Sequence, residues 1–237
     1  TIAIEENIVK PKTDGLLKIE TPAGAIEVIY SKKNDKVEWV ELTNVESYLC
    51  SENLSIVSSD LGEINFDVSY GGNFYAIIDY QNNFSGIQDY SANDIIKYSN
   101  EIRKKINLKY KSKFIHPSDS TIRDVSHILW VGDKIDQESS SRNAVFYGDK
   151  AIDRSPCGTG TSARMAQLYF KGNLKLNEEF IHESYIGSKF IGTIIKESKL
   201  GTYRSITPKI KGWARIHGYN NIIIDKDDPY AYGFQVV

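Results

Sequence analysis

The residues whose types and spacing could do chemistry lie together in positions 153–166, with the sequence DRSPCGTGTSARMA. They follow a strand-like stretch, NAVFYGD, and lead into a predicted helix over 158–171. A cysteine at the start of a helix faces backbone N–H groups and the positive end of the helix dipole, which lower the pKa of its thiol. We therefore predict that Cys157 is a reactive thiol able to move protons.

The residues around Cys157 indicate what it would act on. Gly158, Thr159 and Gly160 let a ligand approach the backbone closely, and free N–H groups at a helix start bind carboxylate or phosphate. Asp153, four residues before the thiol, could accept a hydrogen bond from a cationic amine beside that carboxylate. Together these groups suit a zwitterionic amino acid.

Other interpretations of this segment stay open. Gly-Thr-Gly-Thr is also compatible with a phosphate-binding turn beside a buried, unreactive cysteine. The Gly-Lys-Ser/Thr ending of a P-loop and the Gly-x-Ser-x-Gly of a hydrolase are both missing from it. The four histidines, at positions 116, 127, 182 and 217, occur singly without the spacing of metal ligands, so no metal is predicted.

Strand-forming stretches dominate the elements that must position these residues. β-Branched and aromatic residues predict strands at 16–30, with a hairpin turn at 21–24, and at 37–42, 64–71, 73–80, 126–132, 143–150, 180–197 and 207–218. Helical spacing predicts one helix over 91–108, capped by Ser91 or Asn93, and the second over 158–171. Many strands without regular strand–helix alternation predict an α+β fold.

Composition limits the class of partner. Lys and Arg number 29 against 31 Asp and Glu, so a net charge of -2 offers no basic surface for nucleic acid or membrane. No apolar stretch approaches the roughly 20 residues that span a bilayer. With 41% hydrophobic residues in 237, we expect one or two globular domains, a cytoplasmic location and a small-molecule partner.

The segment 153–166 closely resembles the second cysteine motif of the proline racemase family, which includes the 4-hydroxyproline epimerases. The stretch YGGNFYAIID at 70–79 resembles the GGNF strand of that family, and 183–192 resembles its E-S-x-I-G-x-x-F-x-G segment. TPAG at 21–24 and DDPYAYGF at 227–234 fit as well. The resemblance extends over essentially the whole chain.

The resemblance implies a diaminopimelate-epimerase-like fold of two lobes, each a curved mixed sheet around a central helix. Residues 1–48 and 206–237 would form the first lobe and 49–205 the second, and a homodimer is possible. It also implies an isomerase without cofactor or metal, in which one cysteine removes the α-proton and another delivers a proton to the opposite face. Cys157 would be one acid/base, Asp153 would bind the ring amine, and Gly158 and Thr159 would hold the carboxylate.

The sequence departs from the family pattern at the first cysteine. The Met-Cys-Gly-His-Gly-Thr motif of the family does not occur in the chain. Residues 1–6 resemble the end of the helix that this motif opens, so we expect the chain to be truncated and the first cysteine to lie upstream of Thr1. Cys50 lacks a glycine-rich helix start and is predicted to be a structural thiol.

Finer features bear on the substrate. The dehydratases of trans-3-hydroxyproline in this family carry threonine where Cys157 stands, so cysteine favours inversion over loss of water. The stretches 141–143 and 126–132 look more like 4-hydroxyproline epimerases than proline racemases. We therefore expect a 4-hydroxyproline 2-epimerase in which His127 hydrogen-bonds the ring hydroxyl, although His127 could equally be a sheet histidine. Proline racemase, the dehydratase and a non-catalytic amino-acid-binding fragment are the alternatives, and Asn73 and Phe74 could line the cleft.

Overall fold

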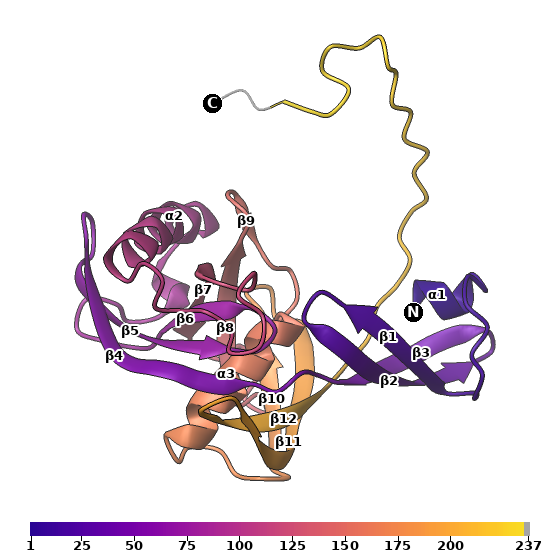
Figure 1. Ribbon diagram of the computed structural model, residues 1–237, viewed down its shortest axis with the longest axis horizontal. Helices are drawn as coiled ribbons and strands as arrows, with labels where there is room; N and C mark the ends of the chain where they lie inside the picture. The colour runs from indigo at the N-terminus through magenta and orange to yellow at the C-terminus, as the bar shows by residue number, and fades with distance from the viewer. Residues whose placement is uncertain (235–237) are drawn as a thin grey trace.

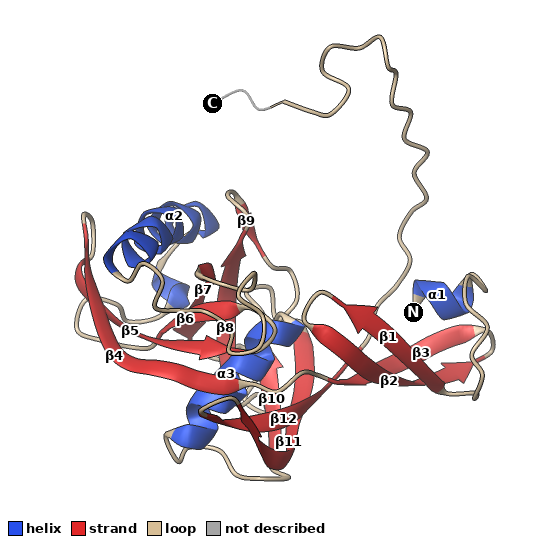
Figure 2. Cartoon of the chain, in the orientation of Figure 1, coloured by secondary structure: helices blue, strands red, loops and turns tan. Residues whose placement is uncertain are grey.

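A computed structural model describes residues 1–234 as a long curved sheet with a helix inside its bend (Figures 1 and 2). The elements, in chain order, are α1 (Ile2–Glu5), β1 (Leu16–Thr21), β2 (Gly24–Lys33), β3 (Lys36–Thr43), β4 (Tyr48–Ser58), β5 (Gly62–Tyr70), β6 (Phe74–Ile78), the 3₁₀ turn η1 (Ile87–Asp89), α2 (Ala92–Lys109), β7 (Val125–Gly132), β8 (Ser141–Tyr147), β9 (Ala151–Ile152), α3 (Gly158–Phe170), β10 (Glu179–Glu183), β11 (Lys189–Leu200) and β12 (Tyr203–Gly212).

The strands form one mixed sheet in the order β1-β2-β3-β12-β11-β10-β8-β7-β6-β5-β4, with β9 beside β8. Most neighbours are antiparallel, and β6–β7 and β8–β10 are parallel. A bridge between Ser47 and Ile206 joins the start of β4 to β12, so the sheet nearly closes on itself. This arrangement agrees with the α+β class that the strand-rich sequence predicts.

The near-closure of the sheet encloses α3. This helix contacts β4, β5 and β6 on one side and β11 and β12 on the other, and all of its residues from 160 to 167 are buried. Figure 2 shows α2 on the opposite face of β5–β8, where Ile95, Ile102 and Ile106 complete the main hydrophobic core. Because side chains alternate along a strand, Phe74 and Ala76 of β6 face α2, whereas Tyr75 and Ile77 pack with Ala163 of α3.

The first three strands form one end of the sheet. Ile4 of α1 packs there with Tyr30 and Val37 in a small hydrophobic cluster of their own. β12 runs across residue 206, the predicted boundary, and pairs with β11 along most of its length and with β3 at its end. The division of the chain into two lobes stays a prediction.

Two parts of the chain differ from the sequence-based expectation. β4 was not predicted, and the strand expected over 207–218 ends at Gly212. Residues 213–234 contain turns but no strand, and they run outward from the rest of the molecule (Figure 1). Among residues 1–234, none of the helices combines the length and apolar character needed to cross a membrane.

Candidate active site

Cys157 is the N-cap residue of α3 and adopts a backbone conformation that is rare for a residue with a side chain. Its φ is +67° and its ψ is 114°. The turn is held because its N–H donates to Ser155 Oγ (3.0 Å) and its carbonyl accepts from the Thr161 N–H (2.7 Å). Backbone strain of this kind costs about 1–3 kcal/mol and gathers at functional sites. The local structure thus supports the motif as a site and not only as a helix start.

Cys157 is partly buried as a residue, and its sulfur lies beside polar groups. Its Sγ lies 3.2 Å from Tyr75 Oη and 3.8 Å from Thr159 Oγ1. Burial raises the pKa of the thiol, while hydrogen bonds from Tyr75 and from the Gly160 N–H lower it without overcoming burial. The lowered pKa expected from the helix start is therefore wrong for this structure, because the sequence does not reveal how deeply the sulfur is buried.

Asp153 stands just before the turn, half-buried. Its Oδ1 accepts from both the N–H (2.8 Å) and the hydroxyl (2.9 Å) of Ser155, the residue that in turn accepts from the Cys157 N–H. The negative charge of Asp153 raises the pKa of Cys157 and acts in the same direction on His127. The charge of Asp153 therefore acts on both Cys157 and His127.

His127 comes from β7 and lies opposite Tyr75 of β6, so both rings stand on the face of the sheet that meets α3. The ring centroids are 4.8 Å apart. Burial, together with a smaller effect of the charge of Arg103, lowers the pKa of His127 to about 4. The imidazole is accordingly neutral at neutral pH, with Nδ1 at 2.6 Å from Ser126 Oγ.

Tyr75 is the functional candidate that sequence reasoning missed. Its side chain is fully buried, and its hydroxyl lies 2.5 Å from Thr159 Oγ1 as well as 3.2 Å from Cys157 Sγ. Alternation along the strand places it on the face opposite Phe74. Since every residue of β6 is buried, the sequence does not show which face meets the helix. Phe74 packs in the core beside α2 and also lines a cavity at the start of α3, which is described below.

A cluster of buried polar side chains holds the turn that precedes α3. Asn143 Nδ2 donates to the Pro156 carbonyl (2.9 Å) and contacts His182 Nε2 (3.0 Å), while Thr161 Oγ1 lies 3.0 Å from His182 Nδ1. Burial lowers the pKa of His182 to about 3, so the ring is neutral. These contacts fix the carbonyl directly before Cys157.

The glycine pair between β5 and β6 lets that turn approach the start of α3. A Cβ on Gly71 would lie 2.2 Å from the Thr159 carbonyl, and one on Gly72, whose φ is +117°, would lie 2.7 Å from Thr159 Cγ2. Asn44 Nδ2 joins the two elements by donating to Gly71 O (2.9 Å) and Ser162 Oγ (2.8 Å). Any side chain at Gly71 would displace Thr159.

A cavity of about 630 Å³ opens at this point. Gly158 and Thr159 line it, with Asn73 and Phe74 from the turn before β6 and further residues from the β1–β2 turn and from 121–126. A Cβ on Gly158 would meet nothing within 4 Å, so the backbone at the helix start is accessible. The predicted carboxylate-binding residues therefore face a space of suitable size for a small ligand. Among residues 1–234, no group of three His, Cys, Asp or Glu side chains is arranged to hold a metal ion.

Cys50 lies away from this site. It belongs to β4, packs against the core that includes α2, and has its Sγ 3.7 Å from Tyr203 Oη. Burial raises the pKa of its thiol. Its environment is that of the structural thiol predicted from its sequence.

The sequence is similar to one protein family and to named members of it. A family model described as proline racemase matches residues 1–235. A 4-hydroxyproline 2-epimerase of Spirosoma linguale is 53% identical over 237 residues, which is 100% of this chain and 70% of that protein. A 4-hydroxyproline 2-epimerase of Shewanella loihica is 51% identical over 237 residues, which is 100% of this chain and 71% of that protein.

Solved structures resemble the fold. A probable proline racemase from Agrobacterium radiobacter K84, with bound carbonate, superposes with a TM-score of 0.88 at 26% identity, covering 100% of this chain and 68% of the other. A hydroxyproline epimerase from Agrobacterium vitis, with bound trans-4-hydroxy-L-proline, superposes with a TM-score of 0.87 at 25% identity. The match covers 100% of this chain and 67% of the other. These likenesses confirm the predicted α+β fold class.

Proposed function

The chain belongs to the proline racemase family, and we propose that it acts in the inversion of 4-hydroxyproline at Cα, as a 4-hydroxyproline 2-epimerase. Relatives at 51–53% identity carry that name, and a solved relative holds trans-4-hydroxy-L-proline. The observation that carries the proposal is the Cys157 thiol on a strained turn, directly before two residues that line an open cavity.

Each group around the turn has a role in binding this substrate. The N–H groups of Gly158 and Thr159, at the start of α3, bind the carboxylate. Asp153 accepts a hydrogen bond from the ring ammonium. Neutral His127, whose Nδ1 lies 2.6 Å from Ser126 Oγ, forms a hydrogen bond with the ring hydroxyl.

The proton transfer follows from the same arrangement. Cys157, as thiolate, takes the α-proton from one face of the ring, and the electron pair left on Cα is delocalised into the carboxylate, whose charge the helix start stabilises. An acid on the opposite face then protonates Cα and completes the inversion. In the reverse reaction Cys157 is the acid and the opposite group the base.

The opposite acid/base is not Cys50, which packs beside α2 and away from the turn. In our proposal a second thiol outside these 237 residues fills this role. We accordingly expect the 237-residue chain alone to leave trans-4-hydroxy-L-proline uninverted, because one thiol removes a proton without redelivering it to the other face.

The test uses a fusion in which any segment of the Spirosoma linguale relative that precedes its match to this chain is joined ahead of Thr1. In deuterated water the fusion should convert trans-4-hydroxy-L-proline to the cis-D isomer with deuterium at Cα. Cys157→Ser should lower kcat by about 10³-fold or more, since it removes the acid/base, and Cys50→Ser should not. Inversion that persists in Cys157→Ser would contradict the proposal.

The alternative substrates are separated in the same experiment. A higher kcat/KM for L-proline identifies a proline racemase. Loss of water from trans-3-hydroxy-L-proline identifies the dehydratase, and binding of hydroxyproline without any α-proton exchange identifies a non-catalytic amino-acid-binding protein.

A further inference from the structure

We propose that Tyr75 is the positioning residue of the Cys157 sulfur: its hydroxyl donates to Thr159 while the sulfur is protonated and turns to the sulfur when the thiolate forms. The proposal rests on the function assigned to Cys157 above, and it adds a second, remote residue to the acid/base. Tyr75 reaches the site from 82 positions earlier in the chain.

The Tyr75 hydroxyl has one proton and lies within hydrogen-bonding distance of two acceptors. Tyr75 Oη lies 2.5 Å from Thr159 Oγ1 and 3.2 Å from Cys157 Sγ, distances at which a phenol O–H can donate to either atom. The two acceptors themselves are 3.8 Å apart. A rotation of the O–H bond alone therefore changes the acceptor without moving the ring.

Packing fixes the ring that carries this hydroxyl. Tyr75 is fully buried in a cluster with Ile77, Leu129 and Ala163. A Cβ on Gly160 would lie 3.2 Å from Tyr75 Cε1, so the helix presses directly on the edge of the ring. On the other side, the His127 ring centroid is 4.8 Å away. The hydroxyl is thus held beside the sulfur by contacts from three elements.

A hydrogen-bond donor is needed at Cys157 to stabilise its thiolate. Burial and the charge of Asp153 both disfavour a thiolate at Cys157, and neutral His127 contributes no positive charge. Hydrogen bonds from the Tyr75 hydroxyl, the Gly160 N–H and, more weakly, the Thr159 hydroxyl oppose them by lowering the pKa of Cys157. Burial also raises the pKa of Tyr75 well above its ordinary value, so the phenol keeps its proton throughout and only redirects its hydrogen bond. No proton leaves Tyr75 in either direction of the reaction.

The test measures the ionisation of Cys157 without any substrate. In the 237-residue chain carrying Cys50→Ser, the rate of alkylation by iodoacetamide is followed against pH. Tyr75→Phe keeps the ring and removes the donor, so we expect the midpoint of the profile to move to higher pH by about one pH unit, the value of one hydrogen bond to a charged group. A structural role of the ring alone would leave this midpoint in place.

A matched control is Tyr48→Phe. Tyr48 is also fully buried, and its hydroxyl has no hydrogen-bond partner within residues 1–234, so the midpoint for Cys157 should equal that of the parent. Circular dichroism and thermal unfolding establish that both variants are folded. A midpoint in Tyr75→Phe equal to that in Tyr48→Phe would overturn the proposal.

A second variant tests whether Thr159 competes with the sulfur for the Tyr75 proton. Thr159→Val removes the competing acceptor, but it also removes a hydrogen bond from Thr159 that lowers the pKa of Cys157, so it is used as a background and not by itself. In the Thr159→Val background the Tyr75 proton has no other acceptor than the sulfur, so Tyr75→Phe should raise the midpoint by a different amount than in the parent. An equal shift in both backgrounds would overturn the exchange between acceptors. Because the assay involves no turnover, a chain that fails to invert hydroxyproline still reports on Tyr75, and the two proposals fail separately.

Discussion

Single residues of the site differ in how far the sequence predicts them. Cys157, Gly158 and Thr159 are contiguous, so a turn followed by a helix start brings them together whatever the rest of the fold. The pKa of Cys157 is different, because burial is decided by strands far away in the chain. The role of Tyr75 cannot be predicted from the sequence for the same reason. Only the pairing of β5, β6 and β7 around α3 brings its hydroxyl to Cys157.

Substrate preference is expected to depend on His127. His127→Phe preserves a ring against Tyr75 but removes both nitrogens. A hydrogen bond to a buried hydroxyl is worth about 0.5–1.5 kcal/mol, so the ratio of kcat/KM for trans-4-hydroxy-L-proline to that for L-proline should fall by up to about tenfold. The ratio is measured in the fusion, where it cancels any general loss of stability.

The control for this variant is His116→Phe. The His116 ring likewise lies 4.8 Å from a tyrosine, Tyr70, but His116 lines a cavity that includes neither Gly158 nor Thr159. We expect the ratio to stay at its parent value. An unchanged ratio in His127→Phe as well would identify His127 as a sheet residue without a role in selecting the hydroxyl.

Among the elements, α2 was predicted well and β4 was missed. The helix carries its own start, since Ser91 and Asp94 form a reciprocal capping box, and its apolar residues recur at helical spacing. β4 instead contains several serines and two irregularities in its register with β5, so it lacks the regular alternation of a strand. Its existence depends on pairing with β5, which local sequence does not reveal.

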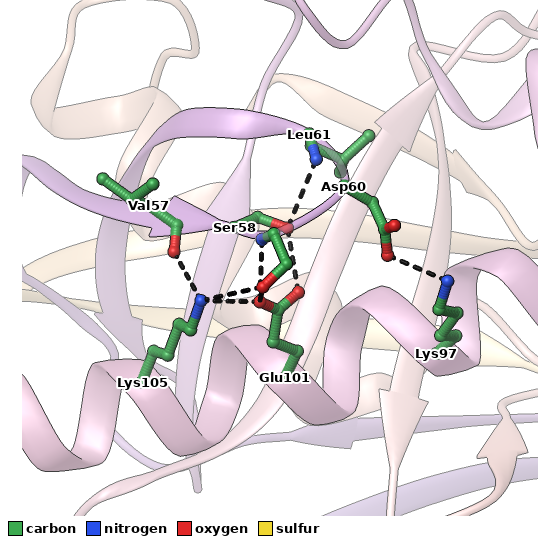
Figure 3. Close-up of polar contacts among 8 residues, drawn as sticks. Val57, Ser58, Asp60, Leu61, Lys97, Glu101 and Lys105 are labelled. Atoms are coloured by element: carbon green, nitrogen blue, oxygen red, sulfur yellow. Dashed lines mark hydrogen bonds and ion pairs between the residues drawn. The ribbon is translucent and has the colours of Figure 1, made fainter.

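Polar contacts from α2 hold the β4–β5 turn, as Figure 3 shows. Glu101 accepts from Ser58 Oγ (2.9 Å) and from the Ser59 N–H (2.8 Å), and Lys105 Nζ reaches the Val57 carbonyl (2.8 Å) and Glu101. Lys97 pairs with Asp60 nearby (2.9 Å). Burial alone would raise the pKa of Glu101, but the hydrogen bonds from Lys105 and Ser59 outweigh it and lower the pKa to about 2.

This lowered pKa predicts a pH-dependent contribution to stability. A carboxyl whose pKa falls on folding stabilises the folded protein at pH values above the carboxyl's ordinary pKa, which is 4.5 for Glu101. This stabilisation disappears as the pH falls from 4.5 towards 2. Glu101→Gln should therefore lower the free energy of unfolding by about 1–2 kcal/mol at pH 7, and the difference from the parent should shrink over that range. Urea unfolding at pH 7, 4 and 3 measures it.

Glu52→Gln is the matched control, because Glu52 is exposed on the adjoining strand β4. It should leave the free energy of unfolding unchanged at each pH. A constant difference between Glu101→Gln and the parent from pH 7 to pH 3 would mean that the ion pair and hydrogen bonds of Glu101 do not form in solution.

At the scale of the molecule, the sheet that curves around α3 places the chemistry at the end of the most enclosed element. The strand order brings β6, distant from α3 in sequence, to the first turn of α3 and brings β12 to the other side of the helix. The resemblance to a known family was needed to anticipate this closure, because strand stretches alone predict a sheet but not the order of its strands.

The enclosure of α3 predicts a gradient of local stability. All residues from 160 to 167 of α3 are buried, whereas α2 buries a single stripe (Ile95, Ser99, Ile102 and Ile106) and 213–234 is mostly exposed with a few turn hydrogen bonds. Amides open to solvent at a cost set by the contacts that must break first. Hydrogen exchange followed by mass spectrometry should therefore be slowest for peptides of α3, faster for α2, and complete within seconds for 213–234. Exchange in α3 as fast as in α2 would mean that the sheet does not close around the helix in solution, and the strained turn at Cys157 would then lack the support on which its chemistry depends.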